Sequence, residues 1–147
     1  MKFTFSIVAI AACLAIPGIV VAQDLPRTVT DLGLTDIQIR EKPNAEYGRR
    51  VAGTLPSGFR VEVDLNGKNE IEDIEARGSD LFPVADIHGL VPAPVIGNTS
   101  WPTDARLEKI EFESDGRIEM KGRLSDGREF DAEFAADGRM LDFDTDG

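Results

Sequence analysis

The sequence predicts an α+β fold made of two tandem units, each a short helix or turn packed on a four-stranded antiparallel β-meander. Two observations carry this prediction. Residues 107–144 alternate apolar and charged side chains in four short runs separated by SDG, SDG and ADG, and such loops are strong hairpin signals. Residues 53–65 (GTLPSGFRVEVDL) then match residues 122–134 (GRLSDGREFDAEF) at a constant offset of 69, which indicates an internal repeat.

The loops within the two matching segments set the strand register. A three-residue loop with Gly127 in the left-handed conformation fixes which residues face each other, and Gly58 has the same place in the earlier segment. The expected partners are Gly122 with Phe130, Met120 with Ala132, Lys121 with Asp131 and Arg123 with Glu129, and, earlier, Gly53 with Val61, Val51 with Val63, Ala52 with Glu62 and Arg50 with Asp64. One face of each hairpin is apolar, and we expect the charged face to stay in solvent.

The repeat extends beyond the hairpins. LPRTV (residues 25–29) and VPAPV (residues 91–95) precede residues 37–39 and 110–112, respectively, each of which is an edge-strand candidate. The turn at 66–68 matches the one at 137–139, and a fourth strand follows each. A two-residue turn would place Ile71 on the solvent-exposed face of the sheet, so we expect a bulge or a longer loop between Asn66 and Ile71.

The helix signals are short. In residues 23–33, Asp24 can cap, Val29 and Leu32 share a face, and Gly33 can end the helix. Residues 78–102 contain four prolines and three glycines, which favour a connector with at most one helical turn around residues 81–87. Because its apolar side chains are too numerous for a free linker, we expect them to pack over a sheet, and we expect no credible helix in the second unit.

Residues 1–22 are predicted to be a secretory signal peptide. Lys2 provides a positive start, an apolar run follows, and Val20-Val21-Ala22 is a small-residue cleavage site before Gln23. The chain is therefore expected in the periplasm or outside the cell, with no membrane span after cleavage. Two alternatives stay open, a retained anchor and a lipoprotein acylated at Cys13.

Cleavage would leave 125 residues, which we divide into unit 1 (23–77), a connector (78–105) and unit 2 (106–147). This part has 15 basic and 27 acidic residues, a formal charge of −12, which excludes nucleic acid and anionic membrane surfaces as electrostatic partners. Because Cys13 is the only cysteine, the exported part has no thiol chemistry.

The sequence contains no enzyme signature. His88 is the only histidine, so neither a catalytic triad nor a histidine metal pair can form. No phosphate-binding glycine loop is present, the paired carboxylates lie on solvated strand faces, and we expect no cofactor.

The C-terminus carries a weak metal signal. Asp142, Asp144 and Asp146 match the start of a D-x-D-x-D-G calcium loop. The alternation of the last strand includes Phe143, and an extended strand would point Asp142 and Asp144 to one side without curling them around an ion. The alternative is an acidic, frayed tail.

The pattern of an apolar-Pro start, GLTDI, a strand, G-x-L-x-x-G-x-x-V-x-V-x-L, N-G-K and an acidic strand is similar to PepSY and PepSY-like domains, including β-lactamase-inhibitor-like tandem forms. The likeness covers residues 25–76 and, less typically, 91–144. It implies a short helix against an antiparallel sheet, no catalytic residues, and regulation or inhibition of secreted peptidases. Its shared positions are turn glycines and core residues, so it transfers no functional site.

These observations favour an exported, non-enzymatic protein that binds another protein, such as a peptidase, through a sheet face or edge strand. Tyr47, Phe59 and Trp101 are candidate anchors because aromatic residues in loops are common hot spots, and core packing is the alternative for each. Two other functions stay open, an acidic module that responds to calcium or another cation, and a structural envelope protein without a discrete ligand.

Overall fold

The computed structural model describes residues 24–42 and 47–146, so the predictions about the signal peptide and Cys13 lie outside the described residues. Antiparallel strands are the main secondary structure of the described residues. The strands are β1 (Thr35–Glu41), β2 (Gly48–Thr54), β3 (Arg60–Asn66), β4 (Ile71–Ala76), β5 (Phe82–Pro83), β6 (Arg106–Phe112), β7 (Ile118–Arg123), β8 (Glu129–Phe134) and β9 (Met140–Thr145). The helices are α1 (Arg27–Thr30), the 3-10 helix η2 (Val84–Leu90) and α2 (Ala93–Ile96).

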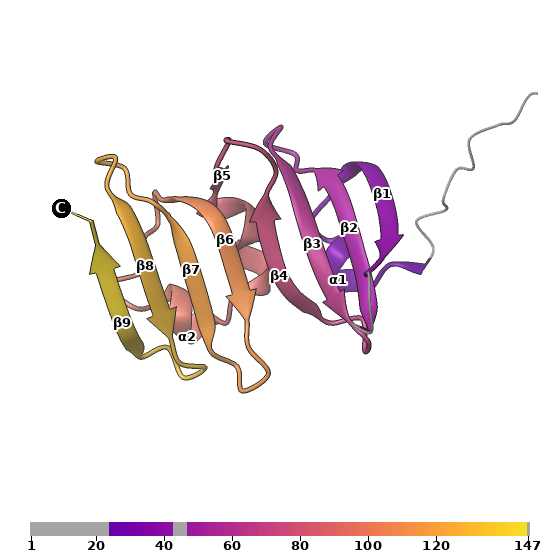
Figure 1. The fold of residues 1–147 in the computed structure, drawn as a ribbon. Coiled ribbons are helices and arrows are strands. Elements are labelled where there is room, and N and C mark those ends of the chain that lie inside the picture. Colours follow the sequence, from indigo (N-terminus) through magenta and orange to yellow (C-terminus); the bar gives the residue numbers. More distant parts are fainter. Residues whose placement is uncertain (1–23, 43–46, 147) are drawn as a thin grey trace, which may run out of the picture.

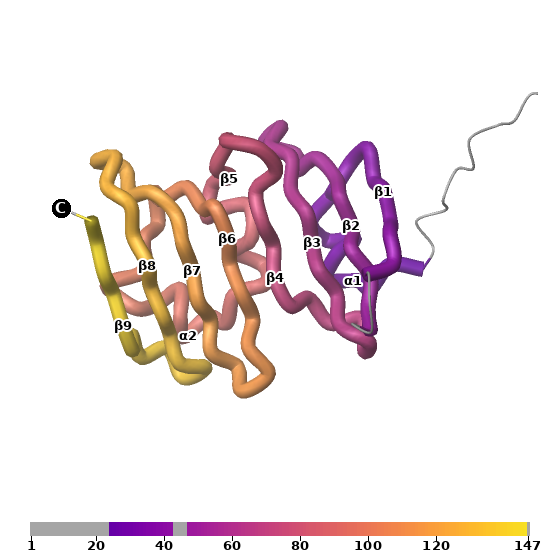
Figure 2. Tube along the Cα trace, in the orientation of Figure 1, coloured from indigo at the N-terminus to yellow at the C-terminus, as the bar shows by residue number. Residues whose placement is uncertain are grey.

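The strands form one continuous sheet in the order β1-β2-β3-β4-β6-β7-β8-β9, and β5 pairs with the start of β6 (Figure 1). The sheet therefore continues from β4 to β6 across the chain's longest connection. Figure 2 shows this connection, which contains η2 and α2, crossing behind the sheet. α1 lies on the same side of the sheet (Figure 1). One face of the sheet is covered and the other is open. β6, predicted as an edge strand, is instead an interior strand between β4 and β7.

Both predicted hairpin registers are confirmed. Gly53 faces Val61 and Arg50 faces Asp64, while Gly122 faces Phe130 and Arg123 faces Glu129. The turns have the expected geometry. Gly58 and Gly127 have φ values of 92° and 91°, and each donates its backbone N–H to the residue three positions earlier. The left-handed residue and the alternating pattern thus determine the pairing locally.

The two halves of the sheet also carry irregularities at matching places. The register of β3 with β4 shifts between Asp64 and Leu65, and that of β8 with β9 shifts between Glu133 and Phe134, which are offset by 69 residues. Asn69, with φ 63°, occupies the place that Gly138 has in the second half, with φ 90°. The predicted irregularity after Asn66 is thus a three-residue loop, and a bulge follows at Glu72 in β4.

The helix α1 lies where the sequence predicts it, but its N-terminal cap differs from the prediction. α1 buries Val29 and ends before Gly33, which has φ 66°, but its N-cap is Pro26 and no side chain caps it, so the role predicted for Asp24 is wrong. The connector was expected to hold at most one helical turn around residues 81–87, and this is wrong, because it contains the seven-residue η2 and then α2. Residues 106–146, the described part of the predicted second unit, contain no helix, as expected. α2 begins after Pro92 as α1 begins after Pro26, because proline is tolerated at the first turn of a helix. No helix in the described ranges is long and apolar enough to cross a membrane.

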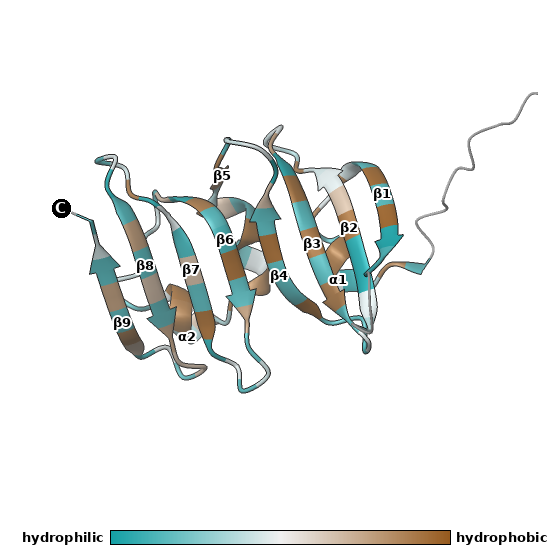
Figure 3. Ribbon diagram, in the orientation of Figure 1, coloured by the Kyte–Doolittle hydropathy of each residue, from teal (hydrophilic) through white to brown (hydrophobic). Residues whose placement is uncertain are grey.

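The core lies between the sheet and the connector, as the alternation of apolar and polar residues along the strands indicates (Figure 3). The connector fills it with Phe82, Val84, Ile87, Val95 and Trp101, which confirms that its apolar residues pack over the sheet. One expectation about the opposite face is wrong. Glu62 and Asp64 point away from the core but are only 8% and 7% exposed, since neighbouring charged side chains cover them.

Candidate functional site

The open face of the sheet carries a continuous row of carboxylates. Register pairs connect one residue from each of β3, β4, β6, β7, β8 and β9: Asp64, Asp73, Glu111, Glu119, Glu133 and Asp142. We call these six residues the acidic row. At the usual strand spacing of about 4.8 Å the row extends over roughly 24 Å. Arg50 and Arg40 continue it on β2 and β1. Like charges directly opposite each other destabilise a sheet, so this row is costly unless cations neutralise it.

The β3 end of the acidic row is neutralised from within the chain. Arg50 donates two hydrogen bonds to Asp64, at 2.7 and 2.9 Å, and lies 2.8 Å from Glu62. Lys42 lies 3.6 Å from Asp64, and Arg77 lies 2.7 Å from Glu62. Burial of Asp64 opposes its ionisation, but Arg50 and Lys42 outweigh the burial and hold its pKa below the ordinary value. This end of the row is therefore a closed ion-pair network.

The next position, on β4, is different. Burial, together with the charge of Asp64, raises the pKa of Asp73 to about 6, and Lys109 at 3.9 Å offsets this only in part. Lys109 makes its closer contact with Glu111. β4 and β6 share three register pairs here, and beyond them a groove of about 720 Å³ runs between the strands. Its lining includes Glu72, which Lys42 binds at 2.5 Å, and Glu113. The seam between β4 and β6 is thus incompletely neutralised.

On β6 and β7 the carboxylates gather more closely. Oxygen atoms of Glu111, Glu113 and Glu119 lie within 4.8 Å of one another, and these three are the one such group among the described residues. Arg117 lies 2.5 Å from Glu133 and 3.8 Å from Glu119, but it also binds Asp115 at 2.8 Å. Carboxylate oxygens in this arrangement suit a lysine, an arginine or a hard metal cation.

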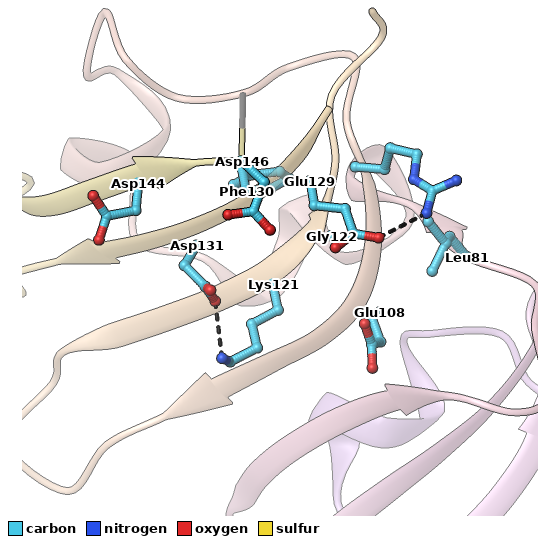
Figure 4. Close-up of a pocket in the computed structure, with 10 residues that line it drawn as sticks. Leu81, Glu108, Lys121, Gly122, Glu129, Phe130, Asp131, Asp144 and Asp146 are labelled. Atoms are coloured by element: carbon cyan, nitrogen blue, oxygen red, sulfur yellow. Dashed lines mark hydrogen bonds and ion pairs between the residues drawn. The ribbon is translucent and has the colours of Figure 1, made fainter. Parts of the chain in front are cut away.

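The C-terminal end of the open face is hollowed, with a volume of about 350 Å³ (Figure 4). There Lys121 of β7 reaches Asp131 of β8 at 3.1 Å, and Asp144 of β9 lies opposite Asp131. Arg123 binds Glu129 at 2.9 Å on the same side of the sheet. These ion pairs are exposed, so acidic groups here are open to an incoming cation.

The predicted aromatic anchors do not form one surface. Tyr47, at the start of the β2–β3 hairpin, is 87% exposed, whereas Phe59 lies in the turn at its other end. Phe59 is partly buried, and the Arg106 guanidinium carbon lies 4.9 Å from its ring centroid. Trp101 is only 6% exposed and packs against Phe134 at 5.8 Å, as its core-packing alternative requires.

The predicted calcium residues lie on or just after β9. Asp142 faces Glu133 and Asp144 faces Asp131, so both follow the extended strand and point to one side, while Asp146 lies after the strand's end. Sequence reasoning missed the closer group of Glu111, Glu113 and Glu119. The SDG loop at 114–116 could have indicated it, because the three-residue loop rule applied there places Glu111 opposite Glu119.

Comparisons with protein-family models and with curated proteins found no match. Among solved structures, the chain is similar to a protein of Bacteroides vulgatus that is provisionally assigned to the periplasm and has no known function. That match has 17% identity and a TM-score of 0.47, and covers 83% of this chain and 93% of the other. A second one, from the DUF2874 family of the same organism, has 20% identity and a TM-score of 0.46, and covers 83% and 91%.

Proposed function

We propose that this is an exported, non-enzymatic PepSY-like protein of the periplasm that binds a basic segment of another protein on its open sheet face. A secreted peptidase or another envelope protein is the proposed class of partner, and regulation or inhibition is the proposed consequence. The acidic row carries the proposal. Six carboxylates in register lie on a face that no described helix covers. The three at its centre, Asp73, Glu111 and Glu119, share two cations of the described chain, Lys109 and Arg117.

The proposal includes two tandem units that share the sheet. Their support is the repetition of several independent features at nearly constant offsets. The β2–β3 and β7–β8 hairpin registers match at an offset of 69 residues, and so do the register shifts of the β3–β4 and β8–β9 pairs. The helices α1 and α2, each with a proline N-cap, match at an offset of 66. The second unit would thus take α2 from the predicted connector.

The chemistry of the seam favours a cationic side chain as the group recognised. A lysine or arginine entering beside Asp73 and Glu111 would relieve the repulsion between these facing carboxylates. It would also lower the pKa of Asp73, because an opposite charge favours the ionised form. Binding would thus be strongest above the pKa of Asp73, which is about 6, and would weaken as salt screens the charges.

The test compares two variants of equal charge. In the row variant, Asp73→Asn, Glu111→Gln and Glu119→Gln neutralise the centre of the acidic row. In the control variant, Asp31→Asn, Asp80→Asn and Asp104→Asn remove three exposed carboxylates elsewhere. A hexalysine peptide is titrated into each by calorimetry at low salt, and each is used for affinity capture from envelope extract.

We expect the control variant to bind like the unchanged protein and the row variant to lose at least tenfold in affinity, about 1.4 kcal/mol. Equal binding by both variants would reject the acidic row as the recognition surface. If instead millimolar calcium raises the melting temperature of the unchanged protein but not of the row variant, and hexalysine does not bind, the cation-responsive alternative is the better explanation.

A further inference from the structure

Among the described strands, β1 and β9 end the sheet, and each has a neighbour on one side only. Such edges are templates for pairing with another chain. β9 also exposes two large apolar side chains, with Met140 42% and Leu141 45% exposed. Because the strands alternate in direction along the whole sheet, a second copy placed in line would present its β1 antiparallel to β9 of the first.

The interior of the molecule already contains a junction of this kind. At the seam, β4, the last strand of the first half, pairs with β6, the first strand of the second half. The pairs are Asp73 with Glu111, Ile74 with Ile110, and Glu75 with Lys109. Ile74 and Ile110 are fully buried on the core side, and the other two pairs lie on the open face.

The internal repeat allows the register of the β4–β6 pair to be transferred to a β9–β1 pair. β4 corresponds to β9 at the offset of 69, which places Asp142, Phe143 and Asp144 where β4 has Asp73, Ile74 and Glu75. β1 corresponds to β6 at an offset of 71, since Arg40 faces Arg50 just as Glu111 faces Glu119. Gln38, Ile39 and Arg40 then occupy the places of Lys109, Ile110 and Glu111.

We infer that the protein associates with itself head to tail, with β9 of one copy paired to β1 of the next in the register of the β4–β6 seam. The three contacts are complementary. Asp142 meets Arg40 of the next copy, Asp144 meets Gln38, and Phe143 meets Ile39 on the apolar side, where both are already partly buried. An opposite-charge pair and an aromatic with a β-branched residue are favourable cross-strand pairs.

The same residues disfavour the competing arrangement. Pairing β9 with a second β9 would bring Asp142 and Asp144 of two copies together, and like charges across strands repel. The contact is therefore heterologous, and a heterologous contact that does not close produces open chains of molecules rather than dimers. This inference rests on the tandem correspondence proposed above and is independent of partner binding.

Sedimentation velocity over a range of protein concentrations tests the inference. The protein is expressed from its full sequence, and mass spectrometry defines its N-terminus after export. We expect the average mass to rise with concentration beyond that of a dimer and to fall with added salt. A monomer at every concentration up to about 1 mM, or a dimer that does not grow, would overturn the proposal.

Charge reversal tests the register. Asp142→Arg and Arg40→Asp each replace the attractive pair by a like-charged one, and we expect each to weaken association by roughly tenfold or more. Mixing the two variants restores an attractive pair at every junction, so the mixture should associate again. Asp104→Arg, an equal charge change at an exposed position of the connector, should have no effect.

Undiminished association of both reversed variants, or a mixture that stays as weak as its components, would show that β9 does not meet β1 in this register. The Arg40→Asp variant also separates this inference from the proposed function. It leaves the acidic row intact, so it should still bind hexalysine even when association is lost.

Discussion

The β2–β3 and β7–β8 hairpins share one register, and the two halves of the sheet that contain them differ on the open face. In the β1–β4 half, the acidic groups Glu62 and Asp64 are nearly buried and are bound by Arg50. In the β6–β9 half, the side chains of Arg123 and Glu129 are 52% and 63% exposed. Both halves nevertheless keep the same hairpin register. Turn glycines and apolar alternation therefore suffice to determine the pairing, and the open face is free to carry different chemistry.

The largest expected effect comes from the strand glycine that the two halves share. A Cβ at Gly122 would lie 2.1 Å from the backbone oxygen of Arg106, where only the backbone can move. A Cβ at Gly53 would meet the Leu34 side chain at 3.1 Å and the Thr35 oxygen at 3.2 Å, which small shifts can relieve. We expect Gly122→Ala to cost about 3 kcal/mol of unfolding free energy and Gly53→Ala about 1 kcal/mol, measured by urea denaturation. Equal costs would mean that the two strand pairs approach equally closely.

The second largest expected effect is the loss of stability when an arginine of an ion pair is removed, and it should differ between the two halves of the sheet. Arg50→Ala leaves Glu62 and Asp64 nearly buried without their main cation, whereas Arg123→Ala frees only the exposed Glu129. Since the Arg50 side chain is itself 41% exposed, we expect a loss of about 2 kcal/mol, below the range for a fully buried pair. For Arg123→Ala we expect less than about 1 kcal/mol. Urea denaturation at pH 7 measures the unfolding free energy of both variants. Equal losses in Arg50→Ala and Arg123→Ala would show that the difference in burial of their partners has no effect on stability.

The sequence predicted what is local in this fold. The pairs Gly53 with Val61 and Gly122 with Phe130 depend on a three-residue loop and its left-handed glycine, and both are contained in a dozen residues. The pairing of Asp73 with Glu111 depends on a connection of about 30 residues, for which no local rule gives a register. The acidic row crosses this junction, so it could not be assembled from hairpin patterns alone.

Three further features of the structure could not be predicted from the sequence, each for a specific reason. Alternation showed on which face Asp64 lies, but not that Lys42 and Arg50 would cover it. The helix α2 was missed because Pro92 and Pro94 suggested an interrupted chain, although proline fits the first turn of a helix. For Trp101, aromatic character in a proline-rich loop was consistent with exposure or burial, and only the packing of the connector distinguishes them.

The facing aspartates Asp64 and Asp73 should respond to pH in opposite directions. Because the pKa of Asp73 is raised from 3.8 to about 6, the folded state binds more protons there than the unfolded state between these values, and its contribution to stability falls as pH rises. The pKa of Asp64 is lowered, so its contribution is present above the ordinary value and is lost as pH falls.

Asp73→Asn should therefore stabilise the protein at pH 7, by about 1 kcal/mol after allowance for solvent screening, and the gain should vanish near pH 4. Asp64→Asn should destabilise it at pH 7, with a smaller effect in acid. Urea denaturation at both pH values measures the two profiles. A loss of stability in Asp73→Asn at pH 7 would show that its contact with Lys109 outweighs its burial.

The smallest expected effect on stability is at Tyr47, whose place in the second half is taken by Gly116. The side chain is 87% exposed, so Tyr47→Ala should change the unfolding free energy by no more than about 0.5 kcal/mol. An exposed aromatic that adds nothing to folding can still add to binding, since tyrosine is frequent at hot spots. If Tyr47 is an anchor, Tyr47→Ala should weaken capture of a protein partner while hexalysine binding, which needs only the carboxylates, stays the same. Unchanged capture would leave recognition to the acidic row alone.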